Sequence, residues 1–389
     1  MLYFDWNATA PLLPAAREAW IEADEKFWAN PSTPYRMGVQ ARLALDEARE
    51  TVASLMGVEP GQVIFTSGAT EGNNGLVREA ARRAGPEAAI WISAVEHPSI
   101  REAAKAFWGT GRVVQIPVTQ AGVVDLDWIR DRIKGMCPAV VCVMAVNNET
   151  GVIQPVGEIA RLCREAGVAY FCDAVQWMGK QPDAAGICQG SAAVVASGHK
   201  FGGPKGTGFV ILGPEWQGLK FQFGGSQELD SRAGTENLPG ILAMVAALKA
   251  RCELKLTTIQ REARDRFEDQ LLAMWPGEVV IHGRGTPRNW NTLLVSLPRH
   301  KSGRWISRLD RLGFQVSSGS ACSAGKAGPS LTLHAMGVDP DTASRTVRIS
   351  SGWETPAEAW AQLLESIRQA LEDLDAAGPA DGPGQVITI

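Results

Sequence analysis

The chain has 389 residues, a net charge of −4, 45% hydrophobic residues and 21% charged residues. This balance is typical of a folded soluble protein, and the length is sufficient for two domains. A weakly acidic chain has no electrostatic basis for binding nucleic acid or an anionic membrane surface. The first residues lack the pattern of a signal peptide, and the longest apolar run, 139–146, is too short to span a bilayer. We therefore expect a cytoplasmic enzyme.

The 7 cysteines are odd in number and include no C-x-x-C pair, so we expect neither a disulfide framework nor a metal site. Most of them lie in apolar runs, where cysteine acts as a small buried hydrophobe. Cys322 differs, because it lies among small polar residues and glycines at 317–325. Such a segment predicts a mobile, accessible loop, which is where a reactive thiol is found.

An extended arm at 5–11 precedes predicted helices at 14–28 and 38–56. Strands and helices then alternate. We predict strands at 63–67, 89–93, 112–118, 139–146, 168–173, 192–196 and 208–212. The intervening helices include one that follows the turn at 68–73 and runs to about 83, and others at 98–107, 127–134 and 158–166. Apolar strands separated by helices indicate a mostly parallel sheet covered on both faces.

A long helix from 239 continues as a charged segment to about 274, and the pattern then changes. This part contains shorter predicted strands, at 279–282, 292–297, 315–318 and 346–350. Predicted helices lie between and after them, at 302–312, 330–336 and 355–374. The combination predicts a separate α+β domain. We expect a large domain at 15–252 and a small domain made of 1–14 and 253–375. The tail, 376–389, is rich in glycine and proline, which predicts disorder.

Polar residues follow five of the predicted strands, and the carboxyl ends of strands are where such sheets bind ligands. These residues are Thr70, His97, Asn147, Asn148, Asp173 and Lys200. Lys200 ends the segment Ser197-Gly198-His199-Lys200 directly after an apolar strand. Burial there lowers the pKa of a lysine and makes a neutral amine available for a Schiff base.

A Schiff-base lysine suits pyridoxal phosphate when suitable partners accompany it. Asp173 can pair with the pyridine nitrogen, Gln176 can meet the ring hydroxyl, and His97 can stack on the ring. A phosphate group would bind Gly68, Ala69, Thr70, Ser197 and His199. Pro204 stands where a P-loop needs lysine, and no G-x-G-x-x-G follows the first strand, so nucleotide-binding loops of both kinds are excluded.

Together these residues resemble the cysteine desulfurases of the NifS/IscS group, within the class V aminotransferase family. The resemblance rests on Thr66-Ser67-Gly68-Ala69-Thr70-Glu71, Glu96-His97, Val146-Asn147-Asn148-Glu149-Thr150-Gly151, Asp173-Ala174-Val175-Gln176, Ser197-Gly198-His199-Lys200 and Ser317-Ser318-Gly319-Ser320-Ala321-Cys322. It runs in order over nearly the whole chain. The Cys322 loop is similar to the longer version in that group, and the Arg-Ala-Gly-His-x-Cys pattern of the other desulfurase group is absent.

The resemblance implies an α/β, fold-type-I, pyridoxal-phosphate-dependent transferase, with a mostly parallel seven-stranded sheet in its large domain and a smaller α+β domain. It implies that Lys200 binds the cofactor covalently and moves the substrate Cα proton, assisted by His97. Cys322 would take sulfur from L-cysteine as a persulfide and release alanine, while Arg348 and Asn148 would hold the substrate carboxylate. The implied cofactor-binding residues are Gly68, Ala69, Thr70, His97, Asn148, Asp173, Gln176, Ser197, His199, Lys200 and, from the second subunit of a homodimer, Thr235.

The resemblance also implies an acceptor protein for the sulfur, in iron–sulfur cluster assembly or tRNA thiolation. Some residues depart from the family pattern, and these departures bear on the identity of that acceptor. Ala10 stands where family members often have a threonine, and Trp177 stands where a small residue is common. The segment after Cys322 contains Lys326, and the C-terminal tail does not resemble the end that docks onto a scaffold protein. Two alternatives stay open. A selenocysteine lyase or related C–S/C–Se lyase would use the same lysine and aspartate. A non-catalytic cofactor-binding subunit predicts loss of Lys200, Asp173 or Cys322, and all three are present.

Overall fold

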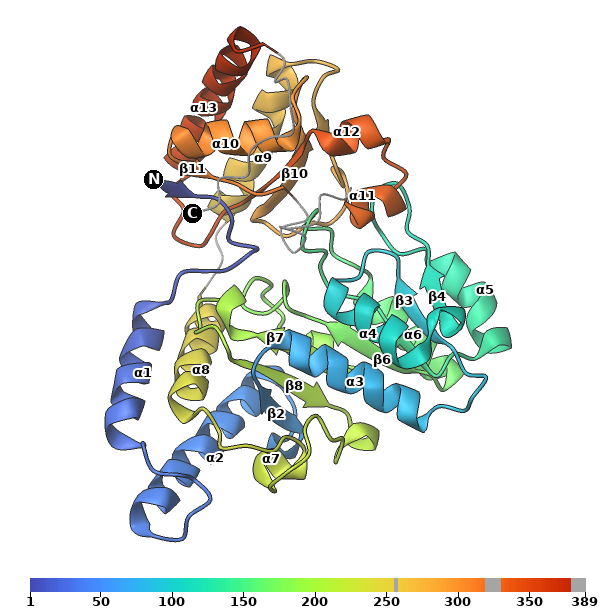
Figure 1. Ribbon diagram of the computed structural model, residues 1–389, viewed down its shortest axis with the longest axis vertical. Coiled ribbons are helices and arrows are strands. Elements are labelled where there is room, and N and C mark those ends of the chain that lie inside the picture. Colours follow the sequence, from blue (N-terminus) through green and yellow to red (C-terminus); the bar gives the residue numbers. More distant parts are fainter. Residues whose placement is uncertain (255–257, 319–329, 379–389) are drawn as a thin grey trace.

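A seven-stranded sheet forms the centre of the protein in the computed structural model, which describes residues 1–254, 258–318 and 330–378 (Figure 1). The strand order is β2-β8-β7-β6-β5-β3-β4. β8 is antiparallel to both of its neighbours and the other pairs are parallel, which confirms the mostly parallel sheet. The strands are β2 (Val63–Thr66), β3 (Ile90–Ser93), β4 (Val113–Ile116), β5 (Val140–Cys142), β6 (Ala169–Asp173), β7 (Ala193–Ser197) and β8 (Gly208–Leu212).

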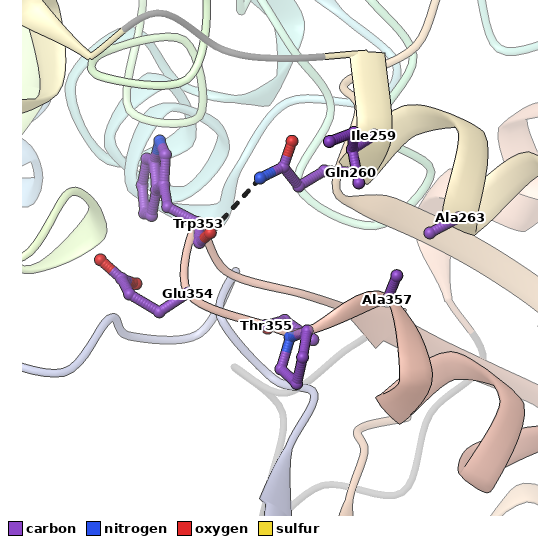
Figure 2. A pocket seen from close by; sticks show the side chains of 8 residues that line it. Ile259, Gln260, Ala263, Trp353, Glu354, Thr355 and Ala357 are labelled. Atoms are coloured by element: carbon purple, nitrogen blue, oxygen red, sulfur yellow. Dashed lines mark hydrogen bonds between the residues drawn. The ribbon is translucent and has the colours of Figure 1, made fainter.

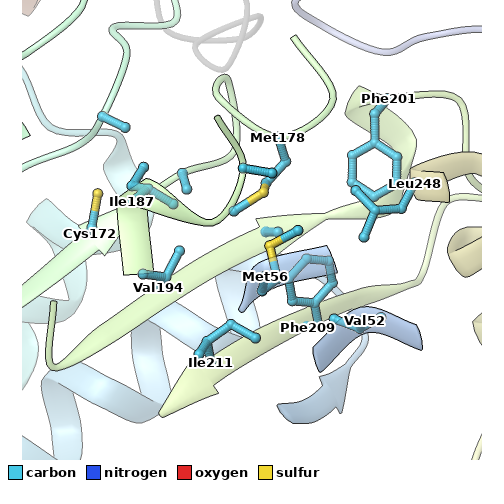
Figure 3. Close-up of a cluster of buried hydrophobic side chains, with 14 of the residues drawn as sticks. Val52, Met56, Cys172, Met178, Ile187, Val194, Phe201, Phe209, Ile211 and Leu248 are labelled. Atoms are coloured by element: carbon cyan, nitrogen blue, oxygen red, sulfur yellow. The ribbon is translucent and has the colours of Figure 1, made fainter. Parts of the chain in front are cut away.

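Helices cover both faces of this sheet, as its apolar strands require. One face packs against α3 (Ala69–Arg83) and α4 (Pro98–Trp108). The other face packs against α2 (Arg36–Met56), α5 (Leu126–Met136), α6 (Val156–Ala166) and α8 (Leu238–Glu253), with α1 (Pro14–Lys26) against α8. Figure 3 shows part of the core on this other face of the large sheet, with Phe209 and Ile211 of β8, Val194 of β7, and Val52 and Met56 of α2.

A second core lies around the antiparallel sheet β12-β10-β9. Its strands are β9 (Val280–Ile281), β10 (Thr292–Ser296) and β12 (Thr346–Ser350), covered by α9 (Thr258–Met274), α10 (Ser302–Arg311) and α13 (Ala357–Ala376). The N-terminal strand β1 (Leu2–Tyr3) pairs in parallel with β11 (Phe314–Gln315), so the start of the chain belongs to this core. Three short helices are also present, α7 (Gln227–Asp230), α11 (Leu331–Ala335) and α12 (Pro340–Ser344), together with short 3-10 turns.

The predicted elements differ from the observed ones mainly at their ends. The strand predicted at 139–146 is observed as β5, and backbone hydrogen bonds to β6 continue from Val143 and Ala145. The strand predicted at 315–318 is β11 followed by a bridge from Ser317 to Arg348. α13 reaches Ala376, the first residue of the predicted tail; residues 379–389 lie outside the described part. Within the described residues, no helix combines the length and the apolar character needed to cross a membrane.

Candidate active site

The carboxyl ends of β6 and β7 bring the two central predicted residues to one edge of the sheet. Asp173 is the last residue of β6 and is buried. Ser197 ends β7, and a 3-10 turn over Gly198–Lys200 follows it directly. Because β6 and β7 are parallel neighbours, Asp173 and the turn that carries Lys200 lie at the same edge of the sheet.

The amine of Lys200 points at the N-terminal arm. Its Nζ donates to the backbone oxygens of Asn7 (2.7 Å) and Ala8 (2.8 Å). The same Asn7 oxygen accepts a hydrogen bond from Gln176 Nε2 at 2.9 Å. Lys200 and Gln176 are therefore gathered around one carbonyl. The ring hydroxyl and the aldehyde of pyridoxal phosphate are on adjacent carbons, so a lysine and a hydroxyl partner that lie side by side fit that cofactor.

A buried hydrogen-bond chain connects Asp173 to His97. Asn73 Nδ2 donates to Asp173 Oδ2 (2.8 Å) and to Ser99 Oγ (2.9 Å), and Ser99 Oγ lies 2.9 Å from His97 Nδ1. Val175 N donates to the other oxygen of Asp173 at 3.0 Å. Both oxygens of Asp173 thus have fixed donors, which hold the carboxylate in one orientation.

Both histidines near Lys200 are neutral. His97 caps α4, and its Nδ1 accepts from Ser99 N, which leaves the proton on Nε2. Burial is the largest cause of the lowered pKa of His97; Lys200 acts in the same direction and Asp173 opposes it. Burial and the nearby Lys200 lower the pKa of His199 to about 4. A neutral His199 can donate one N–H to an anion without carrying charge.

The start of α3 offers an anion site against the end of β7. Gly68 is the N-cap of α3 with no side-chain cap, so the first N–H groups of the helix lack an intrahelical partner. Gly68 has φ +149 and lies close to Ser197 Oγ, 3.5 Å from where a Cβ on Gly68 would be. A Cβ on Gly208 would approach Gly68 Cα to 2.7 Å, so glycine is needed at 208 for this close packing.

Arg348 lies on β12 and reaches the same region from the second core. Its side chain is buried; Nη2 pairs with Asp5 Oδ1 at 2.6 Å, and Nη1 donates to the Asn148 backbone oxygen at 3.1 Å. Nε is buried and has no hydrogen-bond partner among the described residues. A buried donor without an acceptor is costly, and a ligand carboxylate can supply that acceptor.

Cys322 lies outside the described residues, but both flanks of its segment are anchored near Arg348. Ser317 exchanges backbone hydrogen bonds with Arg348, N to O at 3.1 Å and O to N at 2.6 Å. On the other flank, Ser330 Oγ and Thr332 Oγ1 donate to the Glu149 carboxylate at 2.6 and 2.8 Å. Glu149 is the neighbour of Asn148 in the chain, so the segment begins and ends beside the predicted substrate residues.

Thr235 is exposed in the loop before α8 and makes no side-chain hydrogen bond within the described part of this single chain. Arg232 of the same loop pairs with Glu71 at 3.0 Å, which places the loop near the start of α3.

Asn7 and Lys180 are site residues that the sequence analysis missed. Asn7 Oδ1 accepts from Lys180 Nζ at 2.9 Å, and Lys180 Nζ also donates to Gln176 Oε1. The remaining groups of Asn7 contact the second core and the β5 end, through Asn148, Asn291, Thr292 and Ser350. For Asn7, the sequence signal was the presence of an asparagine in the N-terminal arm. For Lys180, nothing in the surrounding sequence indicates that the residue is buried.

One pocket is formed by the start of α9 and the segment before α13 (Figure 2). It is lined by Ile259, Gln260, Ala263, Trp353, Glu354, Thr355, Pro356 and Ala357. None of the predicted site residues is among them, so this pocket is separate from the strand-end cluster.

In the described ranges, no group of three or more His, Cys, Asp or Glu side chains could hold a metal ion.

The sheet, the second α+β core and the strand-end lysine and aspartate define an α/β enzyme of the fold-type-I, pyridoxal-phosphate-dependent class. More narrowly, the chain belongs to the aminotransferase class-V family, whose model matches residues 2–362.

Known proteins of this family confirm the resemblance to the NifS/IscS group. A cysteine desulfurase of Klebsiella pneumoniae is 36% identical over 385 residues, which cover 97% of this chain and 94% of that protein. The cysteine desulfurase IscS of Rickettsia bellii is 35% identical over 358 residues, covering 90% and 86%. A solved structure of a NifS-like protein superposes with a TM-score of 0.86 at 29% identity, over 96% of this chain and 100% of that one.

Proposed function

We propose that this chain is a pyridoxal-phosphate-dependent cysteine desulfurase, which converts L-cysteine to L-alanine and retains the sulfur as a persulfide on Cys322. The observation that carries this proposal is the convergence of Lys200 and Gln176 on the Asn7 carbonyl, beside the fixed carboxylate of Asp173. Bound pyridoxal phosphate supplies a ring that withdraws electrons from the substrate Cα and Cβ.

The side chains of the site divide the remaining work. Asp173 would keep a ring nitrogen protonated, Gln176 would donate to the ring hydroxyl, and His97 would cover the ring. The start of α3 with Ser197 and His199 would bind the phosphate. Lys200 would move the proton at the substrate Cα, assisted by neutral His97.

Substrate selection would depend on Arg348. Its guanidinium offers a buried fork to the carboxylate of L-cysteine, and its Nε has no acceptor among the described residues. The Asn148 side chain would support the same carboxylate. Both residues lie next to the anchored flanks of the Cys322 segment, which supports an attack by that thiol on the substrate sulfur.

In the sulfur-transfer step, the Cys322 thiolate would form an S–S bond with the substrate sulfur while the substrate Cβ–S bond breaks. The electron pair of the broken bond stays with the substrate carbon skeleton, which takes up a proton and leaves as alanine. The outer sulfur of the persulfide would then pass to a thiolate of an acceptor protein for iron–sulfur cluster assembly or tRNA thiolation, which breaks the S–S bond and restores the Cys322 thiolate.

The proposal includes a homodimer in which Thr235 completes the phosphate site of the other subunit. It also includes a cofactor-binding domain at 15–252 and a small domain formed by 1–14 and 253–375. The separate core around β12-β10-β9, with β1 paired to β11, supports that division.

The decisive experiment is anaerobic incubation of the purified protein with L-cysteine and a thiol reductant, with alanine and sulfide both quantified. We expect equal amounts of the two products, lost in Cys322→Ala and retained in Cys137→Ala. Cys137 is a suitable control because it is an exposed free thiol at the end of α5. Equal sulfide from Cys322→Ala would contradict the assigned nucleophile, and faster turnover of selenocysteine with no sulfide from L-cysteine would favour a selenocysteine lyase.

A further inference from the structure

Lys180 is a lysine with no exposed surface, although it is not among the residues to which the proposed reaction assigns a role. It follows Gln176 by one helical turn, in a segment where Lys180 N donates to Trp177 O at 3.0 Å. Lysine is almost never fully buried without partners, because its ammonium group is costly to remove from water. The position therefore requires a specific reason.

The partners of Lys180 are two side-chain amide oxygens. Its Nζ donates to Asn7 Oδ1 at 2.9 Å and to Gln176 Oε1. Both contacts are N–H donations from Lys180, and the oxygen is the part of an amide that can accept them. Lys180 thus selects one of the two orientations in which the Gln176 amide can lie.

The orientation of Asn7 is fixed independently of Lys180. Asn7 Nδ2 donates to Asn148 O at 3.2 Å and to Thr292 Oγ1 at 2.9 Å, so Asn7 Oδ1 must face Lys180. The carbonyl side of Gln176 is then held by Lys180, and one N–H of Gln176 Nε2 is held by the Asn7 backbone oxygen at 2.9 Å. An amide nitrogen has two hydrogens, so the second N–H is directed away from both contacts.

We propose that Lys180, held by Asn7, is a positioning residue that fixes the Gln176 amide so that its N–H, and not its oxygen, meets the ring hydroxyl of the bound cofactor. This inference rests on the proposed function, because it assigns the surroundings of a group that the cofactor would bring. A donor at that oxygen stabilises its ionised form.

Burial lowers the pKa of Lys180 well below its ordinary range, and the nearby cations Lys200 and Arg348 lower it further. The lowered pKa does not reverse the two hydrogen bonds, because a neutral amine also has N–H groups to donate to the amide oxygens. Loss of Lys180 therefore removes the contact that orients the Gln176 amide.

The test is a pH titration of the visible absorbance of the loaded protein. We expect Lys180→Met to raise the titration midpoint by about one pH unit, a tenfold change in proton affinity. Exposed Lys134 on α5 provides the matched control, and Lys134→Met should leave the midpoint unchanged. In steady-state assays, Lys180→Met should lower kcat while the KM for L-cysteine changes little, because Lys180 does not contact the predicted carboxylate site.

A double-mutant cycle separates positioning from general structural support. If Lys180 acts through Gln176, the variant that combines Gln176→Ala with Lys180→Met should shift the midpoint no more than Gln176→Ala alone. That shift would lie well below the sum of the two single shifts. Asn7→Ala, which keeps Lys180 but removes its second acceptor, should raise the midpoint in the same direction. That variant also tests the idea if Lys180→Met does not fold.

The outcomes distinguish this inference from the proposed function. A wild-type protein without a visible cofactor band would refute the proposed function itself. A wild-type band whose midpoint is unchanged in folded Lys180→Met and Asn7→Ala, or shifts that add fully in the cycle, would overturn the positioning role and leave the proposed function intact.

Discussion

Arg348 Nη2 lies 2.6 Å from Asp5 Oδ1, so the arginine predicted to bind a substrate carboxylate already faces a carboxylate of its own chain. Asp5 belongs to the N-terminal arm and bridges to Ser350 at the end of β12. The pair compensates the charge of a side chain that is only 2% exposed. A substrate carboxylate must therefore bind to a guanidinium that is partly neutralised.

Arg348→Lys should raise the KM for L-cysteine by about tenfold to a hundredfold, because a lysine keeps the charge but loses the fork. Asp5→Asn should act oppositely and lower the KM a few-fold, since it removes a competing anion, at some cost in thermal stability. Steady-state kinetics of both variants check this pair of predictions. KM values that rise equally in both would indicate that the two residues only support the fold.

Lys200→Ala should abolish the covalent attachment of the cofactor and lower activity by about 10²–10⁴-fold or more, because a proton-transfer group is lost. Absorbance spectra and borohydride reduction followed by mass spectrometry measure the attachment. Lys205→Ala is the control, since Lys205 is exposed five residues further along the chain. Trapped cofactor on another lysine in Lys200→Ala would show that the attachment residue is misassigned.

Thr235→Ala should weaken cofactor binding by about tenfold, the effect of one lost hydrogen bond to a phosphate. If the site is shared, mixed dimers of Thr235→Ala and Lys200→Ala contain one site with both residues intact. Such mixtures should recover activity at limiting cofactor that neither parent shows. Lack of recovery in proven mixed dimers, or a fully active monomer in sedimentation, would refute a shared site.

Glu96→Gln tests a pH-dependent contribution to stability. Burial, with a further effect of Asp173, raises the pKa of Glu96 to about 8, so the folded protein keeps this carboxyl protonated at neutral pH. An unfolded chain ionises Glu96 above about pH 4.3, so the stabilising contribution is complete below that pH and is lost progressively up to about pH 8. The loss is about 3–5 kcal/mol.

Glutamine does not ionise and keeps an oxygen for the donors Ser93 Oγ and Met144 N, both at 2.7 Å. Denaturant unfolding at pH 5 and pH 8 should therefore show a difference between Glu96→Gln and wild type that grows in favour of the variant as pH rises. A difference that stays constant over this range would mean that Glu96 is ionised in the folded protein.

The sequence was sufficient to predict the parallel sheet and the strand-end residues, because apolar runs and the polar residues after them are local patterns. Asp173 and Lys200 could be placed at one edge for that reason. Asn7 and Lys180 could not be placed, because their roles depend on contacts across long stretches of chain. The bond between Lys180 and Asn7 joins residues 173 positions apart.

Two further differences between the predicted and the observed strands also arise from contacts between segments that are distant in the sequence. β1 was not predicted because a two-residue strand forms only when β11 is present to pair with it. The apolar residues after Cys142 predicted a longer strand; β5 ends at Cys142, but Val143 N and Ala145 N still donate to Phe171 O and Asp173 O of β6 before the chain reaches Asn147 and Asn148. Helix ends at caps, such as Gly57 after α2, were predicted closely because capping is local.

The hydrogen bond from Asn7 N to Ser350 Oγ spans 343 positions of the chain, while Asn7 O receives Lys200 and Gln176 from the middle of it. During synthesis, the strands of the large sheet can emerge and pair long before β12 leaves the ribosome. Asn7 must wait for β12, the last strand of the described residues, before its position is fixed. Nascent chains that end before β12 should thus contain an ordered sheet yet fail to retain the cofactor, so that cofactor loading reports synthesis through β12.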